Sequence, residues 1–270
     1  MNKKNQWPIV QIDPSYSAEI CALLSKLSSN NISAIQIQNF LQPNELNIII
    51  ENMRSQDINW YEGKKNEQGR IGISTTEYHY LENGKQKYFD LVTQADKVQD
   101  QIFDGVENPI NRIIKLFSST FEPKIATESS MQNSKYFSGL VRAMGAKSTL
   151  HFDYAVDQLP GWSVSDLEDQ YALVLHLQVA EKGGELNVYN RQWEPADEKF
   201  NNDVGQKGTY GFTEDFLQDT PYATITPSSG DLIIFRSRNF HQVAAIESSK
   251  PRLTFGTFMG LKNNTLSLWS

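Results

Sequence analysis

Apolar residues recur with a helical period at three places in the first half of the chain. Between residues 15 and 28 they occupy positions i, i+3, i+4 and i+7, the spacing of one face of an amphipathic helix. A second helix is predicted after Pro43, because proline suits a first helical turn and an apolar stripe follows it. Residues 95–118 also have helical spacing, and the Asn108-Pro109 step is expected to kink or divide them.

Alternation of apolar and polar residues predicts strands elsewhere. Residues 34–41 alternate, and two further strands, 75–81 and 85–92, flank Asn83-Gly84, a dipeptide typical of a two-residue hairpin turn. His79 is then expected on this hairpin as an ordinary strand histidine. From about residue 136 onward, the predicted strands are 137–144, 148–154, 171–179, 185–189, 222–225, 231–235 and 253–261.

Helices first and strands afterwards predict one α+β domain over residues 1–270. Residues 1–135 are expected to give helical and hairpin support, and residues 136–270 a β-sandwich or jelly-roll core with the functional site. We find no internal repeat, no low-complexity tract and no linker long enough to separate two domains.

Composition narrows the possible partners. Hydrophobic residues make up 39% and aromatic residues 11%, as in globular proteins. A net charge of −7 disfavours nucleic acid, which requires a basic face, and anionic membrane surfaces. The chain has no apolar signal core or bilayer-spanning stretch, and its single cysteine, Cys21, allows no intrachain disulfide. We therefore expect a soluble cytoplasmic protein, and no feature of the sequence indicates its oligomeric state.

His151 and Asp153 are the most informative polar residues. Alternate side chains of a strand share one face, so these two point the same way and Phe152 points the opposite way. An imidazole beside a carboxylate supplies two of the three ligands of the 2-His-1-carboxylate triad that holds non-haem Fe(II). His241 follows a late predicted strand and is placed to reach across a jelly roll as the third ligand. A structural histidine is the alternative for His241.

A buried arginine is predicted downstream of these ligands. Arg252 begins an apolar, aromatic strand, and an arginine in a core is costly unless it meets a carboxylate in a bidentate pair. Thr254 lies two residues on, on the same face, and adds a hydroxyl donor. A metal triad with such an arginine suits a dicarboxylate keto acid, which chelates the metal at one end and forms a salt bridge at the other. A solvent-exposed strand end is the alternative.

These motifs resemble a known superfamily when taken in order. His151-Phe152-Asp153, His241 and Arg252 are similar in order and spacing to the Fe(II)/2-oxoglutarate-dependent oxygenases of the double-stranded β-helix fold. The segments Gly183–Leu186 and Gly230–Phe235 resemble its prolyl-hydroxylase-type branch. The resemblance implies a cupin-like jelly roll that binds Fe(II), 2-oxoglutarate and O2. It also implies hydroxylation of an unactivated C–H bond, with succinate and CO2 as coproducts.

The same resemblance gives His176 a role. It stands where many relatives have a tyrosine that helps to bind the far carboxylate of 2-oxoglutarate. We therefore expect His176 to join Arg252 and Thr254 in binding the cosubstrate, and a plain core histidine is the alternative.

A closer likeness covers the C-terminal half. Residues 183–195, Asp169-Gln170 and the terminal Trp269-Ser270 are similar to free-standing cyanobacterial alkaloid halogenases of the welwitindolinone type. Those halogenases carry glycine at the position of Asp153, and chloride binds the iron in that vacancy. Because a carboxylate fills the position here, we expect hydroxylation. Halogenation, desaturation or ring closure on the same iron are the alternatives, and a non-catalytic cupin-like binding domain is the alternative of another class.

Two long connections, residues 155–170 and 194–221, are expected to select the substrate and are long enough to form lids. Acidic residues in the first favour either a cationic substrate or a solvated loop. We expect a small free metabolite, an amino acid or an alkaloid-like natural product. Candidate substrate contacts are Tyr154, Trp162, Tyr189 and Trp193, with aromatic packing as the alternative for the last two.

Overall fold

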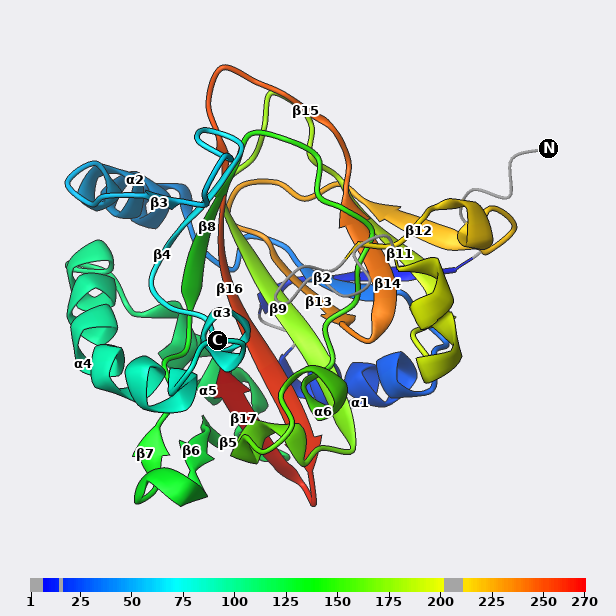
Figure 1. The fold of residues 1–270 in the computed structure, drawn as a ribbon. Helices are drawn as coiled ribbons and strands as arrows, with labels where there is room; N and C mark the ends of the chain where they lie inside the picture. The colour runs from blue at the N-terminus through cyan, green and yellow to red at the C-terminus, as the bar shows by residue number, and fades with distance from the viewer. Residues whose placement is uncertain (1–6, 15–16, 202–210) are drawn as a thin grey trace.

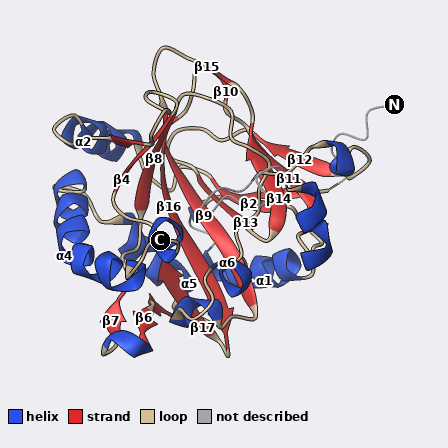
Figure 2. Ribbon diagram, in the orientation of Figure 1, coloured by secondary structure: helices blue, strands red, loops and turns tan. Residues whose placement is uncertain are grey.

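The computed structural model describes residues 7–14, 17–201 and 211–270 of the chain (Figure 1). Two β-sheets form its centre, and helices lie around the larger sheet (Figure 2). The helices are α1 (Ser17–Ser28), α2 (Pro43–Met53), α3 (Thr75–His79), α4 (Gly84–Ile102), α5 (Pro109–Phe117) and α6 (Ala155–Gln158). Within the described ranges, no helix has both the length and the apolar character needed to cross a membrane.

The larger sheet has ten strands and draws on both halves of the chain. Its main path runs through β1 (Ile9–Ile12), β2 (Ala34–Ile37), β13 (Leu232–Arg236), β9 (Asp169–Gln178), β16 (Arg252–Lys262), β8 (Leu140–Met144), β4 (Gln68–Ile71) and β3 (Asn59–Trp60). Beside this path, β17 (Thr265–Trp269) pairs with β16 and with β5 (Glu122–Ile125).

The smaller sheet is formed by β12 (Tyr222–Ile225), β11 (Leu186–Gln192) and β14 (Asn239–Val243). It lies on the opposite side of the molecule from α2 and α4 (Figure 1). Two short pairs are separate from both sheets: β10 (Lys182–Gly183) with β15 (Ile246–Glu247), and β6 (Thr127–Glu128) with β7 (Ser134–Lys135).

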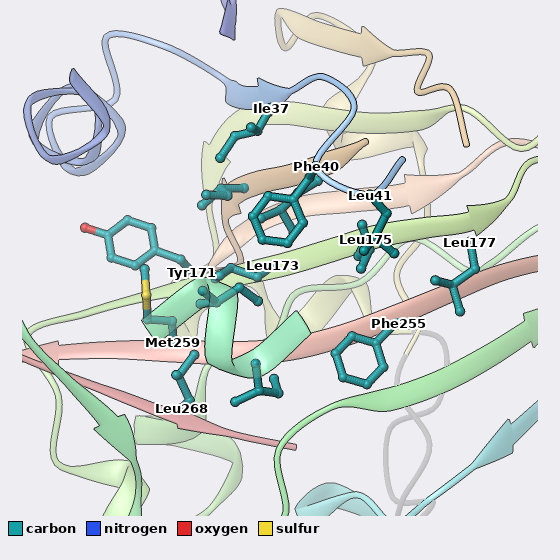
Figure 3. Packing of buried hydrophobic residues seen from close by; sticks show 14 of the residues in the cluster. Ile37, Phe40, Leu41, Tyr171, Leu173, Leu175, Leu177, Phe255, Met259 and Leu268 are labelled. Atoms are coloured by element: carbon teal, nitrogen blue, oxygen red, sulfur yellow. The ribbon is translucent and has the colours of Figure 1, made fainter. Parts of the chain in front are cut away.

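One face of the larger sheet packs against the helices. Leu173, Leu175 and Leu177 alternate along β9 and enter the main hydrophobic cluster together with residues of α1, α2 and α5. Figure 3 shows Leu175 in this layer with Phe255 of β16, which antiparallel pairing places opposite it. Full burial of an aliphatic or aromatic side chain contributes roughly 1.5–3 kcal/mol. The helices thus close this face, and polar side chains of the same strands project from the other.

The other face meets the smaller sheet. Ala172 of β9, Phe235 of β13, Val188 of β11 and Ala223 of β12 belong to one buried cluster between the two sheets. Two sheets packed face to face over an apolar layer are the β-sandwich core that the strand pattern predicted. The first half of the chain adds five strands at the sides of the larger sheet, so the core extends beyond residues 136–270.

The predicted helices in the first half are confirmed, including the division at Pro109. Helix α4 ends at Ile102 and α5 begins at Pro109. The side chain of Asn108 accepts a hydrogen bond from the backbone N–H of Ile110, at 2.9 Å, which caps α5. Proline at the first helical position needs no hydrogen-bond partner there, so the second helix starts where the first cannot continue.

The predicted hairpin around Asn83-Gly84 is wrong, because this dipeptide joins two helices, α3 and α4. Asn83 does adopt the left-handed conformation, with φ of 53°, that makes the dipeptide common in hairpins. After it, however, Tyr88, Val92 and Ala95 are buried at helical spacing. His79 therefore ends a short helix and does not lie on a strand.

The predicted strand 148–154 is also wrong as a regular strand. Within the described residues its β-pairing is limited to two isolated bridges, one between Leu150 and Phe212 and one between His151 and His241. Separate hydrogen bonds to Val243 and Ser237 hold the rest of the segment. It is extended enough to pair, but its partners are Phe212 in a connecting segment and His241 of β14, an edge strand of the smaller sheet. The segment that carries His151 and Asp153 is therefore held by separate hydrogen bonds and is not a strand of either β-sheet.

Candidate metal centre

The side chains of His151, Asp153 and His241 converge at one point. One ligand atom from each lies within 4.8 Å of the others. Oδ2 of Asp153 is 3.3 Å from Nε2 of His241 and 3.9 Å from Nε2 of His151. Two imidazoles and one carboxylate on one side of a point are the donor set of the facial triad, which leaves further coordination positions open.

Backbone hydrogen bonds fix this convergence. The N–H of His151 donates to the carbonyl of His241 at 3.0 Å, and the N–H of His241 donates back at 2.8 Å. The N–H of Asp153 donates to the carbonyl of Ser237 at 2.9 Å, and the Ser237 hydroxyl donates to the carbonyl of Asp153 at 2.9 Å. The segment with two ligands is thus joined at both ends to the segment with the third.

The tautomer of both histidines follows from their surroundings. Nδ1 of His151 lies 2.8 Å from the carbonyl oxygen of Thr149, and Nδ1 of His241 lies 2.8 Å from that of Asn239. A carbonyl oxygen only accepts, so each Nδ1 carries the proton and each Nε2 is left with a lone pair. Both free lone pairs are on the Nε2 atoms near Asp153, which is the arrangement a metal requires.

The electrostatics favour the same protonation states. Burial lowers the pKa of His151 to about 4, helped by the charges of His241 and Arg142 and opposed by Asp153. Burial alone would raise the pKa of Asp153. When Nε2 of His241 is protonated it donates a hydrogen bond to this carboxylate, and that bond together with the charges of His151, His241 and Arg142 outweighs burial and lowers the pKa of Asp153. At neutral pH the site therefore offers a neutral His151 and an ionised Asp153, the forms that bind a metal ion.

A second polar group lies on the same inner face. Strand pairing sets Thr254 of β16 opposite His176 of β9, and Arg252 is two residues along β16 from Thr254. All three side chains are buried. Sequence alternation therefore placed Arg252 and Thr254 on one face correctly, and the register adds His176 to that face.

Arg252 and His176 have polar atoms without partners among the described residues. These are Nε of Arg252 and both ring nitrogens of His176, while NH1 of Arg252 approaches the sulfur of Met144 at 3.8 Å. Burial lowers the pKa of Arg252 to about 10, and burial together with the Arg252 charge lowers the pKa of His176 well below its usual value. A guanidinium in this setting is costly without a carboxylate. The donors present fit one end of a dicarboxylate.

Tyr189 and Trp193 are not brought to the ligand atoms. Val188 pairs with His241, so its neighbour Tyr189 projects from the opposite face of the smaller sheet. Trp193 stacks on Phe152 with ring centroids 4.5 Å apart and planes 10° apart. Both belong to an aromatic cluster that supports the back of the metal segment. Both side chains pack against other aromatic residues, which is the alternative role expected for them.

Tyr154 directly precedes α6 in the chain, and Trp162 follows it by four residues. Trp162 packs with Tyr88 of α4 and donates its Nε1–H to Nδ1 of His79 at 3.0 Å. Tyr154 follows the metal segment, and the guanidinium of Arg238 lies 4.8 Å from its ring centroid. Of the four aromatic candidates, Tyr154 is adjacent in sequence to a ligand and Trp162 is buried in a structural cluster.

Arg142 was missed by the sequence reasoning. It stands on β8 within Leu-Val-Arg-Ala-Met, and its charge reaches both His151 and Asp153. The signal was available, because an arginine inside an apolar strand is the same anomaly that identified Arg252.

Together, the two-sheet core, the convergent His-Asp-His group and the buried arginine define a non-haem iron oxygenase of the cupin type. The family model of the carrier-protein-independent halogenase WelO5 matches residues 8–270. The chain belongs to this family, and its predicted place among the Fe(II)/2-oxoglutarate oxygenases of the double-stranded β-helix fold is confirmed.

Two curated proteins are similar in sequence. The chain is 31% identical over 199 residues to leucinostatins biosynthesis cluster protein S of Purpureocillium lilacinum, which covers 71% of this chain and 79% of that protein. It is 28% identical over 136 residues to the L-gamma-glutamyl-L-propargylglycine hydroxylase of Streptantibioticus cattleyicolor, which covers 50% of this chain and 48% of that protein. The second match therefore spans about half of each chain.

A solved structure shares the fold over nearly the whole chain. It is the N-substituted L-amino acid dioxygenase of Burkholderia ambifaria AMMD, with a TM-score of 0.62 at 16% identity, and the match covers 93% of this chain and 91% of that one. The same dioxygenase in complex with alpha-KG gives a TM-score of 0.61 at 16% identity, with the same coverage.

Proposed function

We propose that this chain is an Fe(II)- and 2-oxoglutarate-dependent oxygenase that hydroxylates an unactivated C–H bond of a small free metabolite. Succinate and CO2 are the coproducts. The observation that carries the proposal is the carboxylate of Asp153, 3.3 Å from Nε2 of His241 and directed at the same point as both histidines. The halogenases that the chain resembles have glycine at this position, where chloride binds. A carboxylate there supports hydroxylation.

The chain's own residues have distinct tasks in this reaction. When bound, Fe(II) with 2-oxoglutarate and O2 supplies the oxidising power for C–H cleavage. His151, Asp153 and His241 would hold the metal, and the backbone hydrogen bonds between the two histidines keep these side chains close together.

Arg252 is the proposed anchor for the far carboxylate of 2-oxoglutarate. A bidentate pair with that carboxylate satisfies the buried guanidinium and orients the cosubstrate. Thr254 adds a hydroxyl donor from the same strand face, and His176 adds a ring N–H from β9. Because all three are buried, water has little access to the polar atoms that would bind this carboxylate.

The sequence relative named as a hydroxylase acts on an amino-acid derivative, L-gamma-glutamyl-L-propargylglycine. This supports an amino acid or amino-acid derivative as the substrate of the present chain, ahead of an alkaloid-like natural product. The family description favours a second candidate reaction, halogenation, through the same iron. The two reactions differ in whether oxygen or chlorine is added to the product.

Substrate-stimulated succinate formation tests the proposal. The purified protein is incubated with Fe(II), 2-oxoglutarate, chloride and a metabolite library, and products are examined by mass spectrometry. We expect a product heavier by one oxygen atom, formed in proportion to succinate. A chlorinated product from the wild-type chain would overturn the assignment of hydroxylation to Asp153, and no succinate with any metabolite would count against the oxygenase itself.

A further inference from the structure

Gly256 stands in the middle of β16, a central strand of the larger sheet that runs beside β9 (Figure 1). Glycine weakens the interior of a strand, because it has no side chain to pack and loses more conformational freedom on folding than other residues. The fold does not require glycine here. Its φ is not positive, and an added Cβ atom would lie 3.8 Å and 4.0 Å from the carbonyl oxygens of Leu173 and Leu140, which are ordinary contact distances. Packing therefore does not explain this glycine.

Gly260, on the same strand and the same face, is the opposite case. An added Cβ atom at Gly260 would overlap Cδ2 of Leu167 and would lie 2.9 Å from Cζ3 of Trp269. Because those side chains leave no room for a methyl group, packing requires glycine at this position. Of these two glycines, Gly256 is the one that needs another explanation.

Open space reaches the sheet at Gly256. Its neighbour Phe255 belongs to the cluster packed against the helices, so Gly256 points the other way, toward the smaller sheet. Gly256 is partly exposed, and so is Val174, its partner on β9. Every other residue of β9 from Asp169 to Leu177 is buried. Partial exposure in the middle of a sheet that is covered on both faces places an opening over this pair.

This opening lies beside the candidate metal centre. Gly256 is four residues along β16 from Arg252. The ring centroid of His241 lies 4.9 Å from that of Phe235 on β13. Strand β9 separates β16 from β13, so a cosubstrate that reaches from Arg252 to the metal would cross β9 near Val174. Gly256 lies one strand to the side of that path, and its space is left for the substrate.

The walls of this space are apolar. Strand pairing sets Val174 and Leu140 on either side of Gly256, and Phe258 follows two residues along β16 on the same face. The ring of Phe258 is also partly exposed. An apolar group gains free energy when it leaves water for such a surface, whereas a polar group would lose its hydrogen bonds to water.

We infer that Gly256 is a specificity-determining residue, which leaves room for an apolar group of the substrate close to the metal. This inference rests on the proposed function and narrows it to substrates whose oxidised part is an apolar side chain. The weaker strand at Gly256 is then a consequence of keeping the pocket open, in the way that functional sites commonly lower the stability of a fold.

A size series tests the inference. The probes are N-acetyl-L-alanine, N-acetyl-L-valine, N-acetyl-L-leucine and N-acetyl-L-phenylalanine, which differ only in an apolar side chain. Probe-stimulated succinate formation gives kcat/KM for the wild type, Gly256→Ala, Gly256→Val and the contrasting variant Gly260→Ala. Thermal unfolding gives the Tm of each variant, and the anaerobic charge-transfer band gives its affinity for 2-oxoglutarate.

We expect the wild type to use at least one larger probe with a kcat/KM at least about tenfold above that of the alanine derivative. Gly256→Ala, and more strongly Gly256→Val, should lower kcat/KM for that larger probe by at least about tenfold and leave the alanine derivative within about twofold. The affinity for 2-oxoglutarate should also stay within about twofold, since Arg252 holds that anion.

Stability separates a pocket residue from a packing residue. The Tm of Gly256→Ala should equal or exceed that of the wild type, because the added methyl group has room and alanine favours the strand more than glycine does. The Tm of Gly260→Ala should fall by at least about 2 °C, while its order of preference among the probes stays that of the wild type.

Four outcomes would overturn the inference. An unchanged size preference in Gly256→Val, or no preference for a larger probe in the wild type, would remove the apolar group from this space. A weakened 2-oxoglutarate affinity in Gly256→Ala would assign the space to the cosubstrate. A Tm lowered as far as that of Gly260→Ala would make Gly256 a packing residue. Failure of the proposed function is distinguishable, because the wild type would then give no charge-transfer band before any probe is added. Should Gly256→Val fold poorly, Gly256→Ala adds a single methyl group and still tests the size preference.

Discussion

His151 and His241 are hydrogen-bonded to each other through both backbone amides, at 3.0 and 2.8 Å, and their ring centroids lie 4.2 Å apart. The bridge joins the segment after β8 to β14 through backbone atoms of the chain itself. Two of the three ligands are therefore brought together by the fold, and Asp153 follows through its own bond to Ser237.

Metal removal should consequently leave the fold intact. We expect the chelated protein to keep its far-UV circular dichroism spectrum and cooperative thermal unfolding. Adding Fe(II) or Co(II) at about a hundred times its Kd should stabilise the protein by about 2.7 kcal/mol, because only the folded chain presents the three ligands together. Thermal unfolding with and without metal measures this stabilisation. Loss of the folded far-UV spectrum on chelation would show that the fold depends on bound metal.

Replacing Asp153 with alanine should weaken metal binding. The substitution removes the only carboxylate of the described ligand group, so we expect metal affinity to fall by at least about a hundredfold and hydroxylation to disappear. Asp157→Ala, a change to a nearby acidic residue on α6 outside the ligand group, is the matched control. Titration with Co(II), followed by absorption, measures both. Unchanged affinity in Asp153→Ala would remove this residue from the ligand set.

Replacing Arg252 with alanine should affect the cosubstrate and spare the metal. Loss of a buried carboxylate partner costs about 2–5 kcal/mol, so the Kd of 2-oxoglutarate should rise by at least about thirtyfold. The affinity for Co(II) without cosubstrate should not change, because Arg252 is not one of the three candidate ligand residues. Lys250→Ala, two residues away and exposed, is the control. An unaltered 2-oxoglutarate affinity would refute the anchor.

The proposed metal and cosubstrate residues can be picked out of the sequence because they are anomalies of pattern. His151 and Asp153 stand at alternate positions beside an apolar residue, and Arg252 interrupts an apolar strand. Such residues are costly in a core, so their presence signals a function. Arg142 interrupts the apolar strand β8 in the same way, so the same rule applies to it.

The sheet face on which a side chain lies, and the element with which a segment pairs, were harder to predict. Tyr189 points away from the metal ligands because Val188, and not Tyr189, pairs with His241, and this register depends on strand partners far along the chain. Asn83 adopts the left-handed conformation that the dipeptide predicts, but helices flank it where strands were predicted. The left-handed conformation occurs both in hairpin turns and between helices. Only the burial of Tyr88 and Val92 at helical spacing separates the two possibilities.

The ionised carboxylate of Glu128 should make the free energy of unfolding depend on pH in the acidic range. Burial alone would raise its pKa, but hydrogen bonds from Ser130, Tyr136 and Ser163 outweigh burial and lower it to about 2. A carboxyl whose folded pKa lies below its usual value of 4.5 stabilises the fold fully above pH 4.5 and loses this contribution as the pH falls toward 2. Ser163 belongs to the connection after the metal segment, so the bond also fixes that connection.

Glu128→Gln tests this directly. The variant should lose about 2–3 kcal/mol of unfolding free energy at neutral pH, the usual contribution of hydrogen bonds to a charged group, and the difference from the wild type should shrink below pH 4.5. Urea unfolding at a series of pH values measures it, with the exposed Glu122→Gln as control. A difference that does not vary with pH would rule out the ionised carboxylate as its source.

The most direct test of the oxygenase assignment is anaerobic titration of the metal-free protein with Fe(II) and then 2-oxoglutarate. The His151, Asp153 and His241 group beside Arg252 predicts a metal-to-ligand charge-transfer band that saturates at one Fe(II) and one 2-oxoglutarate per chain. The band should be absent in Asp153→Ala, and it should require much more 2-oxoglutarate in Arg252→Ala. No band in the wild-type protein at saturating Fe(II) and 2-oxoglutarate would contradict the oxygenase assignment and favour a non-catalytic binding domain.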